Sequence, residues 1–302
     1  MSLEDEILRL KRDRNAVILA HNYQRPEVQD IADFVGDSYG LSVEATKTGA
    51  DVIVFCGVDF MAQTAKILNP EKTVLIPSRH ALCPMAMLLT KNELEQVQKN
   101  NPGCETVLYV NTHADVKALA TCICTSANAP KIVSQMKTDM VIFGPDANLG
   151  YFVSKTCDKK LVYAPEAGFC PTHHQIEMVD VERARKKYPN AVLTVHPECQ
   201  PQVQDAADFL GSTTQIIKYC VESDEKEFIV GTEMGIIHRL EREAPGKKFY
   251  PISEMAVCPT MKNITLEKVR NALLKNRFEV EIPKDVMDRA RVGIQRMMDL
   301  SK

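Results

Sequence analysis

Three cysteines, each followed by a proline, recur at an almost constant interval along the chain. Cys83 and Cys170 are 87 residues apart, and Cys170 and Cys258 are 88 residues apart. If folding brings their thiolates to one point, the three sulfurs can hold a metal centre and leave one of its positions open to a ligand, which is typical of catalytic rather than structural sites. The spacing therefore predicts a metal centre with these three cysteines as its ligands.

The stretch before each cysteine repeats as well. An apolar run ends at Gly57, Gly144 and Gly231, and the cysteine follows after 26, 26 and 27 residues. Because glycine, proline and cysteine keep the same register, we interpret the chain as an internal triplication. Short structural repeats reach only about 50 residues, so a period of this size indicates three domains. We expect a pseudo-threefold arrangement of these domains around the cysteines.

Each repeat contains continuous apolar runs separated by helical patterns, which are typical of buried parallel strands joined by helical crossovers. We therefore predict an α/β protein made of three homologous three-layer α/β/α domains. Their expected ranges are 1–86, 87–173 and 174–263. Two further helical patterns within 264–302 are expected to pack on the first domain, beside an N-terminal helix over 3–11.

Polar side chains follow the first apolar run of every repeat. The segments are His21-Asn22-Tyr23, Tyr109-Val110-Asn111 and His196-Pro197-Glu198. Ligands of open parallel sheets bind beyond the carboxyl ends of the strands, where the three Cys-Pro loops also belong. The predicted site residues of this group are His21, Tyr23, Tyr109, Asn111, His196 and Glu198.

A hydroxyl recurs near the start of a predicted helix in each repeat, at Ser38, Ser126 and Thr213. Such a hydroxyl can cap the helix, and together with the helix dipole it can bind an anion. Capping alone would explain any one of them, but three equivalent positions around one centre favour a shared anion site. His173 follows Cys170 in one repeat only, so we interpret it as a substrate contact and not as a metal ligand.

Charge and composition exclude several classes of protein. The formal net charge is −3 and the chain has no long basic run, which argues against a nucleic-acid partner. No apolar run approaches the roughly 20 residues of a membrane span, and residues 1–15 are charged and lack the apolar region of a signal peptide. We therefore expect a cytoplasmic protein without a membrane partner, whose ten cysteines are mostly reduced thiols.

Several of these segments together resemble the quinolinate synthase family, the iron–sulfur enzymes of NAD biosynthesis. The resemblance extends over nearly the whole chain. The segments that carry it are Ala20-His21-Asn22-Tyr23, Asp33-Phe34-Val35-Gly36-Asp37-Ser38, Tyr109-Val110-Asn111, Cys124-Thr125-Ser126-Ala127-Asn128-Ala129, Gly144-Pro145-Asp146-Ala147-Asn148-Leu149-Gly150, Gly168-Phe169-Cys170-Pro171, His196-Pro197-Glu198-Cys199 and Gly211-Ser212-Thr213.

The resemblance implies a [4Fe–4S] cluster held by Cys83, Cys170 and Cys258, with the fourth iron open to substrate. It also implies a transferase that condenses iminoaspartate with dihydroxyacetone phosphate to quinolinate, with loss of phosphate and two waters, and a second enzyme that supplies iminoaspartate. The residues expected to move protons are His21, Tyr23, Tyr109, His196 and Glu198. The expected substrate-binding residues are His21, Ser38, Tyr109, Asn111, Ser126, His173, His196, Glu198 and Thr213.

Two alternatives belong to other classes of protein. An iron–sulfur electron carrier normally uses four closely spaced cysteines, whereas Cys83 and Cys258 are 175 residues apart. A structural zinc protein without activity would need a fourth ligand, and no residue that recurs in all three repeats supplies one. Analysis of bound iron and sulfide would separate the zinc alternative, and an assay of quinolinate formation would separate the carrier.

Overall fold

The structure is a computed structural model that describes residues 2–302, and these residues form three sheets of four strands each. The first sheet has the order β2 (Phe34–Gly36), β1 (Ala16–His21), β3 (Val52–Cys56), β4 (Thr73–Leu75). The second has the order β6 (Cys122–Cys124), β5 (Glu105–Tyr109), β7 (Met140–Gly144), β8 (Lys160–Tyr163). The third has the order β10 (Phe209–Leu210), β9 (Val192–Val195), β11 (Glu227–Gly231), β12 (Lys248–Pro251). All neighbouring strands within the sheets are parallel.

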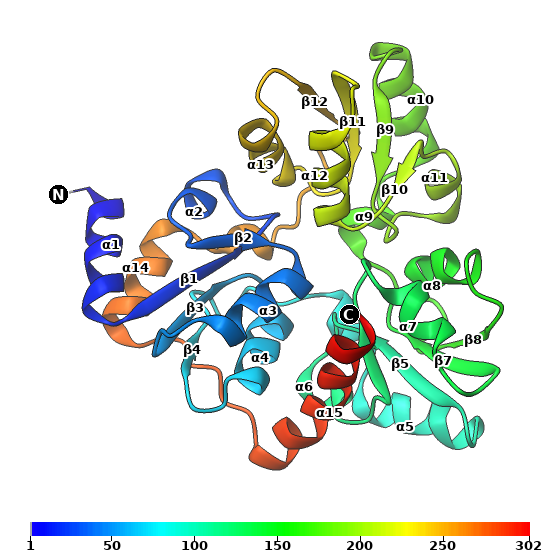
Figure 1. Ribbon diagram of the computed structural model, residues 1–302, viewed down its shortest axis with the longest axis horizontal. Coiled ribbons are helices and arrows are strands. Elements are labelled where there is room, and N and C mark those ends of the chain that lie inside the picture. The colour runs from blue at the N-terminus through cyan, green and yellow to red at the C-terminus, as the bar shows by residue number, and fades with distance from the viewer. Residues whose placement is uncertain (1) are drawn as a thin grey trace.

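Helices flank each sheet, and the three domains surround a common centre (Figure 1). The first domain has α1 (Leu3–Asp13), α2 (Pro26–Asp30), α3 (Ser38–Lys47) and α4 (Asp59–Leu68). The second has α5 (Lys91–Asn100), α6 (Ala114–Lys117), α7 (Ala129–Ser134) and α8 (Ala147–Ser154). The third has α10 (Met178–Lys187), α11 (Pro201–Asp205), α12 (Thr213–Glu222) and α13 (Ile236–Glu243), and short helices follow the cysteines at η1 (Met85–Leu88), α9 (Pro171–His174) and η2 (Met261–Asn263). The prediction of an α/β protein with three such domains is confirmed.

The central strands explain why each repeat folds in this way. All five residues of β3 are buried, and burying a Val, Ile or Phe side chain contributes roughly 1.5–3 kcal/mol. In the first and third sheets, a carboxylate accepts a backbone N–H of the strand beside it. Asp33 accepts the Ile18 N–H and Asp208 accepts the Leu193 N–H, both at 2.8 Å. These contacts match in the first and third domains, and in the second domain the Thr121 hydroxyl accepts the equivalent N–H, of Thr106, at 2.9 Å.

The sequence has three apolar runs in each repeat, which predict three strands, and the structure has four in each sheet. Each sheet has a fourth strand at its edge, β2, β6 or β10, and these strands are only two or three residues long. Strands of this length carry too few residues to show a period in the sequence. They lie directly before the positions of the predicted hydroxyl residues, so they help to place one wall of the centre.

The two C-terminal helices do not both complete the first domain. Helix α14 (Leu266–Lys275) packs on α1, as expected. Helix α15 (Lys284–Leu300) instead packs chiefly on β6 and α6 of the second domain, with fewer contacts to α4 of the first (Figure 1). An ion pair of 3.0 Å between Arg296 and Glu105 supports this position. The buried residues of α15, Ala290, Gly293, Ile294 and Met297, form an apolar stripe. Such a stripe in the sequence indicates that a helix packs on another element but does not specify which one, so the expectation is wrong for α15.

Within residues 2–302, no helix is both long and apolar enough to cross a lipid bilayer.

Candidate active site

A cavity of about 140 Å³ lies at the centre of the molecule, and all three domains line it. Every residue that the sequence analysis assigned to the site reaches this cavity. They are His21, Tyr23, Ser38, Cys83, Tyr109, Asn111, Ser126, Cys170, His173, His196, Glu198, Thr213 and Cys258. The strand-end residues reach it because the parallel sheets direct their carboxyl ends toward the centre. The geometry brings the set together, while the role of each member stays a prediction.

The three cysteines reach the cavity on the loops that follow β4, β8 and β12, and all three are free thiols. Burial raises the pKa of the Cys83 and Cys170 thiols well above the ordinary value, and the charge of Glu198 raises the pKa of Cys170 further. Buried thiols of this kind stay neutral unless a cation stabilises their thiolates. Three free thiols, one from each domain, fit a metal centre with three protein ligands.

His173 lies between Cys170 and Glu198. Its Nδ1 is 3.2 Å from the Cys170 Sγ and 2.8 Å from the Glu198 Oε2, and the ligating atoms of the three residues all lie within 4.8 Å of one another. This set can itself hold a metal ion. The interpretation of His173 as a substrate contact only therefore stays a prediction.

Two histidines at equivalent strand ends have the same hydrogen-bond arrangement. The Nδ1 of His21 accepts the Tyr23 N–H at 3.2 Å, and the Nδ1 of His196 accepts the Glu198 N–H at 3.3 Å. Burial lowers the pKa of each histidine to about 3. Both rings are therefore neutral near pH 7 and carry their proton on Nε2. The His196 Nε2 lies 3.2 Å from the Ser126 Oγ.

Glu198 is the charged centre of the site and is only 5 % exposed. Burial alone would raise its pKa, but His173, His196 and a hydrogen bond from Tyr109 outweigh burial and hold the pKa well below its usual range. Burial and the charge of Glu198 raise the pKa of Tyr23 and of Tyr109. The five residues expected to move protons thus comprise one carboxylate, two neutral phenols and two neutral imidazoles.

The three hydroxyl residues do not cap helices in this structure. The N-cap of α3 is Asp37 rather than Ser38, and the N-cap of α12 is Ser212 rather than Thr213. Ser126 lies in the turn before α7, whose N-cap residue is Asn128. The capping alternative is therefore excluded for these side chains, which face the cavity instead.

One amide at the cavity lacks a protein partner. The Oδ1 of Asn111 is buried and accepts no hydrogen bond within residues 2–302, although Asn111 lines the cavity. An unpaired buried acceptor is unfavourable unless a ligand or water satisfies it. This atom is therefore available to a hydrogen-bond donor of a ligand or water in the cavity.

The sequence analysis missed several residues at the site. Thr232 Oγ1 lies 2.6 Å from the Tyr23 hydroxyl and 2.8 Å from the His173 Nε2. Glu233, which lines the cavity, accepts the Cys258 N–H at 3.1 Å, and Asp59 accepts the Cys83 N–H at 3.0 Å. Asp59 and Glu233 each stand two residues after a repeated glycine, so the repeat register could have revealed them.

Three similar α/β domains around one cavity, with cysteines and buried acid–base side chains in its wall, define a multidomain enzyme with a central active site. A family described as "Quinolinate synthetase A protein" matches residues 5–299, and the chain belongs to this family. The quinolinate synthase of Pyrococcus abyssi is 52 % identical over 301 residues, which cover 100 % of both chains. The quinolinate synthase of Thermodesulfovibrio yellowstonii is 51 % identical over 98 % of this chain and 97 % of the relative, and that of Methanocaldococcus jannaschii is 48 % identical over 99 % of each.

Proposed function

We propose that the protein is a quinolinate synthase, a transferase of NAD biosynthesis. The reaction joins iminoaspartate and dihydroxyacetone phosphate into quinolinate and releases one phosphate and two waters, so no external oxidant or reductant is required. The observation that carries the proposal is that all the residues expected for this chemistry line one cavity, in a chain that aligns over its full length with a quinolinate synthase.

The metal centre proposed for this site is a [4Fe–4S] cluster. Cys83, Cys170 and Cys258 would hold it, because they are free, lie on equivalent loops and reach the same cavity. When bound, the cluster would supply an iron that acts as a Lewis acid. The orphaned Asn111 Oδ1 and the hydroxyls not used in caps are in place to orient a polar substrate beside it.

The protonation states of the side chains assign roles to them. Glu198 is ionised and can accept a proton from substrate, whereas Tyr23 and Tyr109 are neutral and can donate one. The Nε2–H groups of His21 and His196 can donate hydrogen bonds to carbonyl or carboxylate oxygens. Burial of these groups keeps water from competing for the same hydrogen bonds.

The anionic groups of the two substrates are assigned to the hydroxyl residues. Ser38 and Thr213 are the first residues of α3 and α12, where backbone N–H groups and the helix dipole favour negative charge. Ser126 faces the same cavity beside His196. The three positions together can receive carboxylates or a phosphate.

We also propose that the protein is cytoplasmic and has a functional link to an enzyme that produces iminoaspartate. The ten free cysteines suit a reducing compartment. The proposed substrates are small molecules, and the charge of −3 offers no basic surface typical of nucleic-acid binding.

Anaerobic reconstitution followed by metal analysis and a substrate assay tests the proposal. We expect iron and sulfide in similar amounts, and quinolinate only when both substrates are present. A protein that holds iron and sulfide but forms no quinolinate would indicate an electron carrier. Zinc without sulfide would indicate a structural metal, and either result would contradict the proposal.

A further inference from the structure

We propose that Asp59 and Glu233 are positioning residues that hold the Cys83 and Cys258 loops and tie each loop to a neighbouring domain. Two of the three cysteines would then be in place before any metal centre binds. The inference rests on the proposed ligand set of the site, but it concerns the protein without its cluster.

The repeat register identifies the two carboxylates as equivalent. Asp59, Asp146 and Glu233 each stand two residues after the repeated glycine and are spaced 87 residues apart. Each of the three belongs to a different domain, where it lies between a central strand and the loop that carries the cysteine. Asp146 and Glu233 are fully buried, and buried carboxylates are unfavourable unless they are paired or hydrogen-bonded.

In the first domain, Asp59 and the Cys83 loop hold each other by two hydrogen bonds. The Cys83 N–H donates to the Asp59 Oδ1 at 3.0 Å, and the Asp59 N–H donates to the Ala81 carbonyl at 2.8 Å. The other carboxylate oxygen, Oδ2, lies 2.8 Å from the Nε2 of His113. His113 belongs to the second domain, so Asp59 connects the cysteine backbone to the next domain.

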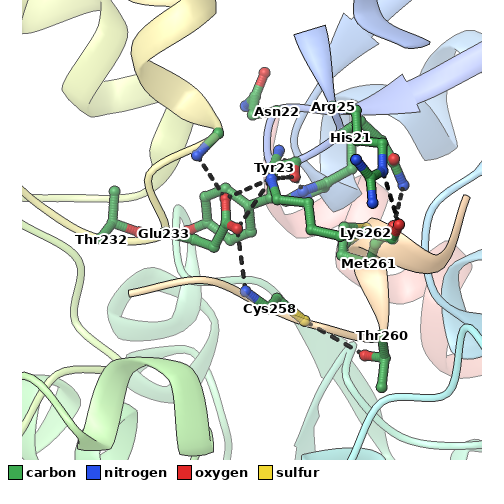
Figure 2. Close-up of polar contacts among 12 residues, drawn as sticks. His21, Asn22, Tyr23, Arg25, Thr232, Glu233, Cys258, Thr260, Met261 and Lys262 are labelled. Carbon is green, nitrogen blue, oxygen red and sulfur yellow. Dashed lines mark hydrogen bonds and ion pairs between the residues drawn. The ribbon is translucent and has the colours of Figure 1, made fainter. Parts of the chain in front are cut away.

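In the third domain, Glu233 holds the Cys258 loop in the same way (Figure 2). The Cys258 N–H donates to its Oε1 at 3.1 Å, and the Lys262 Nζ pairs with the same oxygen at 3.0 Å. Lys262 also donates to the Tyr23 carbonyl of the first domain. The carboxylate, the lysine and the Tyr23 backbone therefore form a continuous link from the cysteine to the neighbouring domain.

In the second domain the corresponding carboxylate makes different contacts. Asp146 caps α8 by accepting the Leu149 N–H at 2.9 Å, and its Oδ2 has no hydrogen-bond partner within residues 2–302. The Cys170 loop has the backbone contact that the other two loops also have: the Ala147 N–H donates to the Gly168 carbonyl at 2.8 Å, as the Met234 N–H donates to the Ala256 carbonyl at 2.9 Å. A Cβ at Gly168 would lie 1.8 Å from the Pro145 carbonyl oxygen, so this close contact requires glycine. The proposal therefore concerns the first and third domains only.

The test measures how fast each cysteine of the cluster-free protein reacts with N-ethylmaleimide, resolved by peptide mass spectrometry. Asp59→Ala should speed modification of Cys83 by roughly ten- to a hundredfold, the equivalent of losing a hydrogen bond to a charged acceptor, and should change Cys258 less than about twofold. Glu233→Ala should have the reverse effect. The matched control is Asp33→Ala, which removes a carboxylate that accepts a backbone N–H at 2.8 Å in the first domain but does not contact a cysteine loop.

The conservative variant Asp59→Asn keeps an oxygen that can accept the Cys83 N–H, so its Cys83 rate should stay near that of the wild type. The proposal is overturned if Asn behaves like Ala, if each Ala variant exposes both cysteines equally, or if Asp33→Ala changes Cys83 as much as Asp59→Ala does. If Asp59→Ala does not fold, His113→Ala is tested in its place. This variant should speed Cys83 modification at least twofold. An unchanged rate would contradict the link between the two domains. The test measures no turnover, so a negative result would contradict this inference and not the proposed reaction. Conversely, a protein that forms no quinolinate would contradict the proposed reaction and not this inference.

Discussion

The hydroxyl of Tyr109 donates a hydrogen bond of 2.5 Å to the Glu198 Oε1, from the end of a strand in the second domain to the end of a strand in the third. Both side chains are almost fully buried. The contact lowers the pKa of Glu198, although burial opposes it. The phenol therefore adds to the larger contributions of His173 and His196, which together keep the carboxylate ionised inside a cavity that would otherwise favour its neutral form.

Tyr109→Phe should lower kcat by roughly ten- to a hundredfold, because the carboxylate loses a hydrogen bond worth about 1.5–3 kcal/mol. The pKa of Glu198 should rise, so the acidic limb of the pH–rate profile should move to higher pH. Steady-state kinetics across pH would measure both effects. Tyr188→Phe, on a tyrosine stacked on Tyr250 away from the cavity, is the control, and an unchanged profile for Tyr109→Phe would remove the residue from the site.

Glu198→Gln should keep the fold and the metal content and lose most turnover. A positioned acid–base group typically contributes about 10² to 10⁴ in rate, and glutamine cannot accept the proton. Quinolinate formation, iron content and circular dichroism would be measured on the same sample. Near-normal turnover would show that another group performs the proton transfer.

Much of the site could be predicted from the sequence because parallel strands direct their carboxyl ends to one edge. Once Cys83, Cys170 and Cys258 define three repeats, the ends of equivalent strands follow: His21 and Tyr109 are the last residues of β1 and β5, and His196 directly follows β9. That argument needs only the register and not the packing. It holds for the strand-end side chains and for the cysteine loops.

The remaining features depend on tertiary contacts that leave no period in the sequence. The partner of α15 is decided by the shape of the surface beside β6, and the stripe on the helix does not encode that choice. Asp59 and Glu233 do keep the repeat period, but a carboxylate after a strand is ordinary, and only their hydrogen bonds to the cysteine backbones show what they do. Helix caps were misplaced by one residue, at Asp37 and Ser212, because hydroxyl and carboxylate neighbours can both cap.

Replacement of each proposed ligand should abolish the metal centre. Cys83→Ser, Cys170→Ser and Cys258→Ser should each lose most bound iron and sulfide after anaerobic reconstitution, because one of three protein ligands is removed. Cys104→Ser and Cys157→Ser are the controls, since neither residue lines the cavity. A full complement of iron and sulfide in Cys170→Ser would mean that His173 or another side chain replaces the sulfur.

Ser126→Ala should weaken binding of quinolinate and of dihydroxyacetone phosphate by roughly ten- to a hundredfold, the effect of one hydrogen bond to a charged partner. The midpoint of thermal unfolding should barely change, because Ser126 caps no helix. Ser212→Ala is the matched contrast, since it removes a capping box and should lower stability by about 1 kcal/mol. Wild-type affinity in Ser126→Ala would mean that the anion site has to be withdrawn.

A buried lysine in the second domain leads to the last prediction. Lys117 is fully buried and its Nζ donates to the carbonyls of Val110, at 2.7 Å, and Thr112. The equivalent residues Gln29 and Gln204 donate to the corresponding carbonyls of the other two domains. The second repeat thus has an ionisable group where the others have a neutral amide.

Burial lowers the pKa of Lys117 from 10.5 to about 7, against the opposing effect of Asp59 and Cys83. Below pH 7 both the folded and the unfolded chain carry the charge, so the full cost of burying it is present. Between pH 7 and pH 10.5 the unfolded chain binds the extra proton, and this contribution to the free energy of unfolding rises with pH.

Lys117→Gln should therefore stabilise the protein most below pH 7, on the order of 3–5 kcal/mol at about 1.4 kcal/mol for each tenfold change in proton affinity, and the gain should shrink as the pH approaches 10. Urea unfolding of the cluster-free protein at pH 6 and pH 9.5 would measure the difference. Lys91→Gln, an exposed lysine of α5, should give the same small difference at both pH values. A gain for Lys117→Gln that does not change with pH would show that Lys117 titrates as an ordinary lysine, and that the hydrogen bonds of its ammonium group to the two carbonyls compensate for its burial.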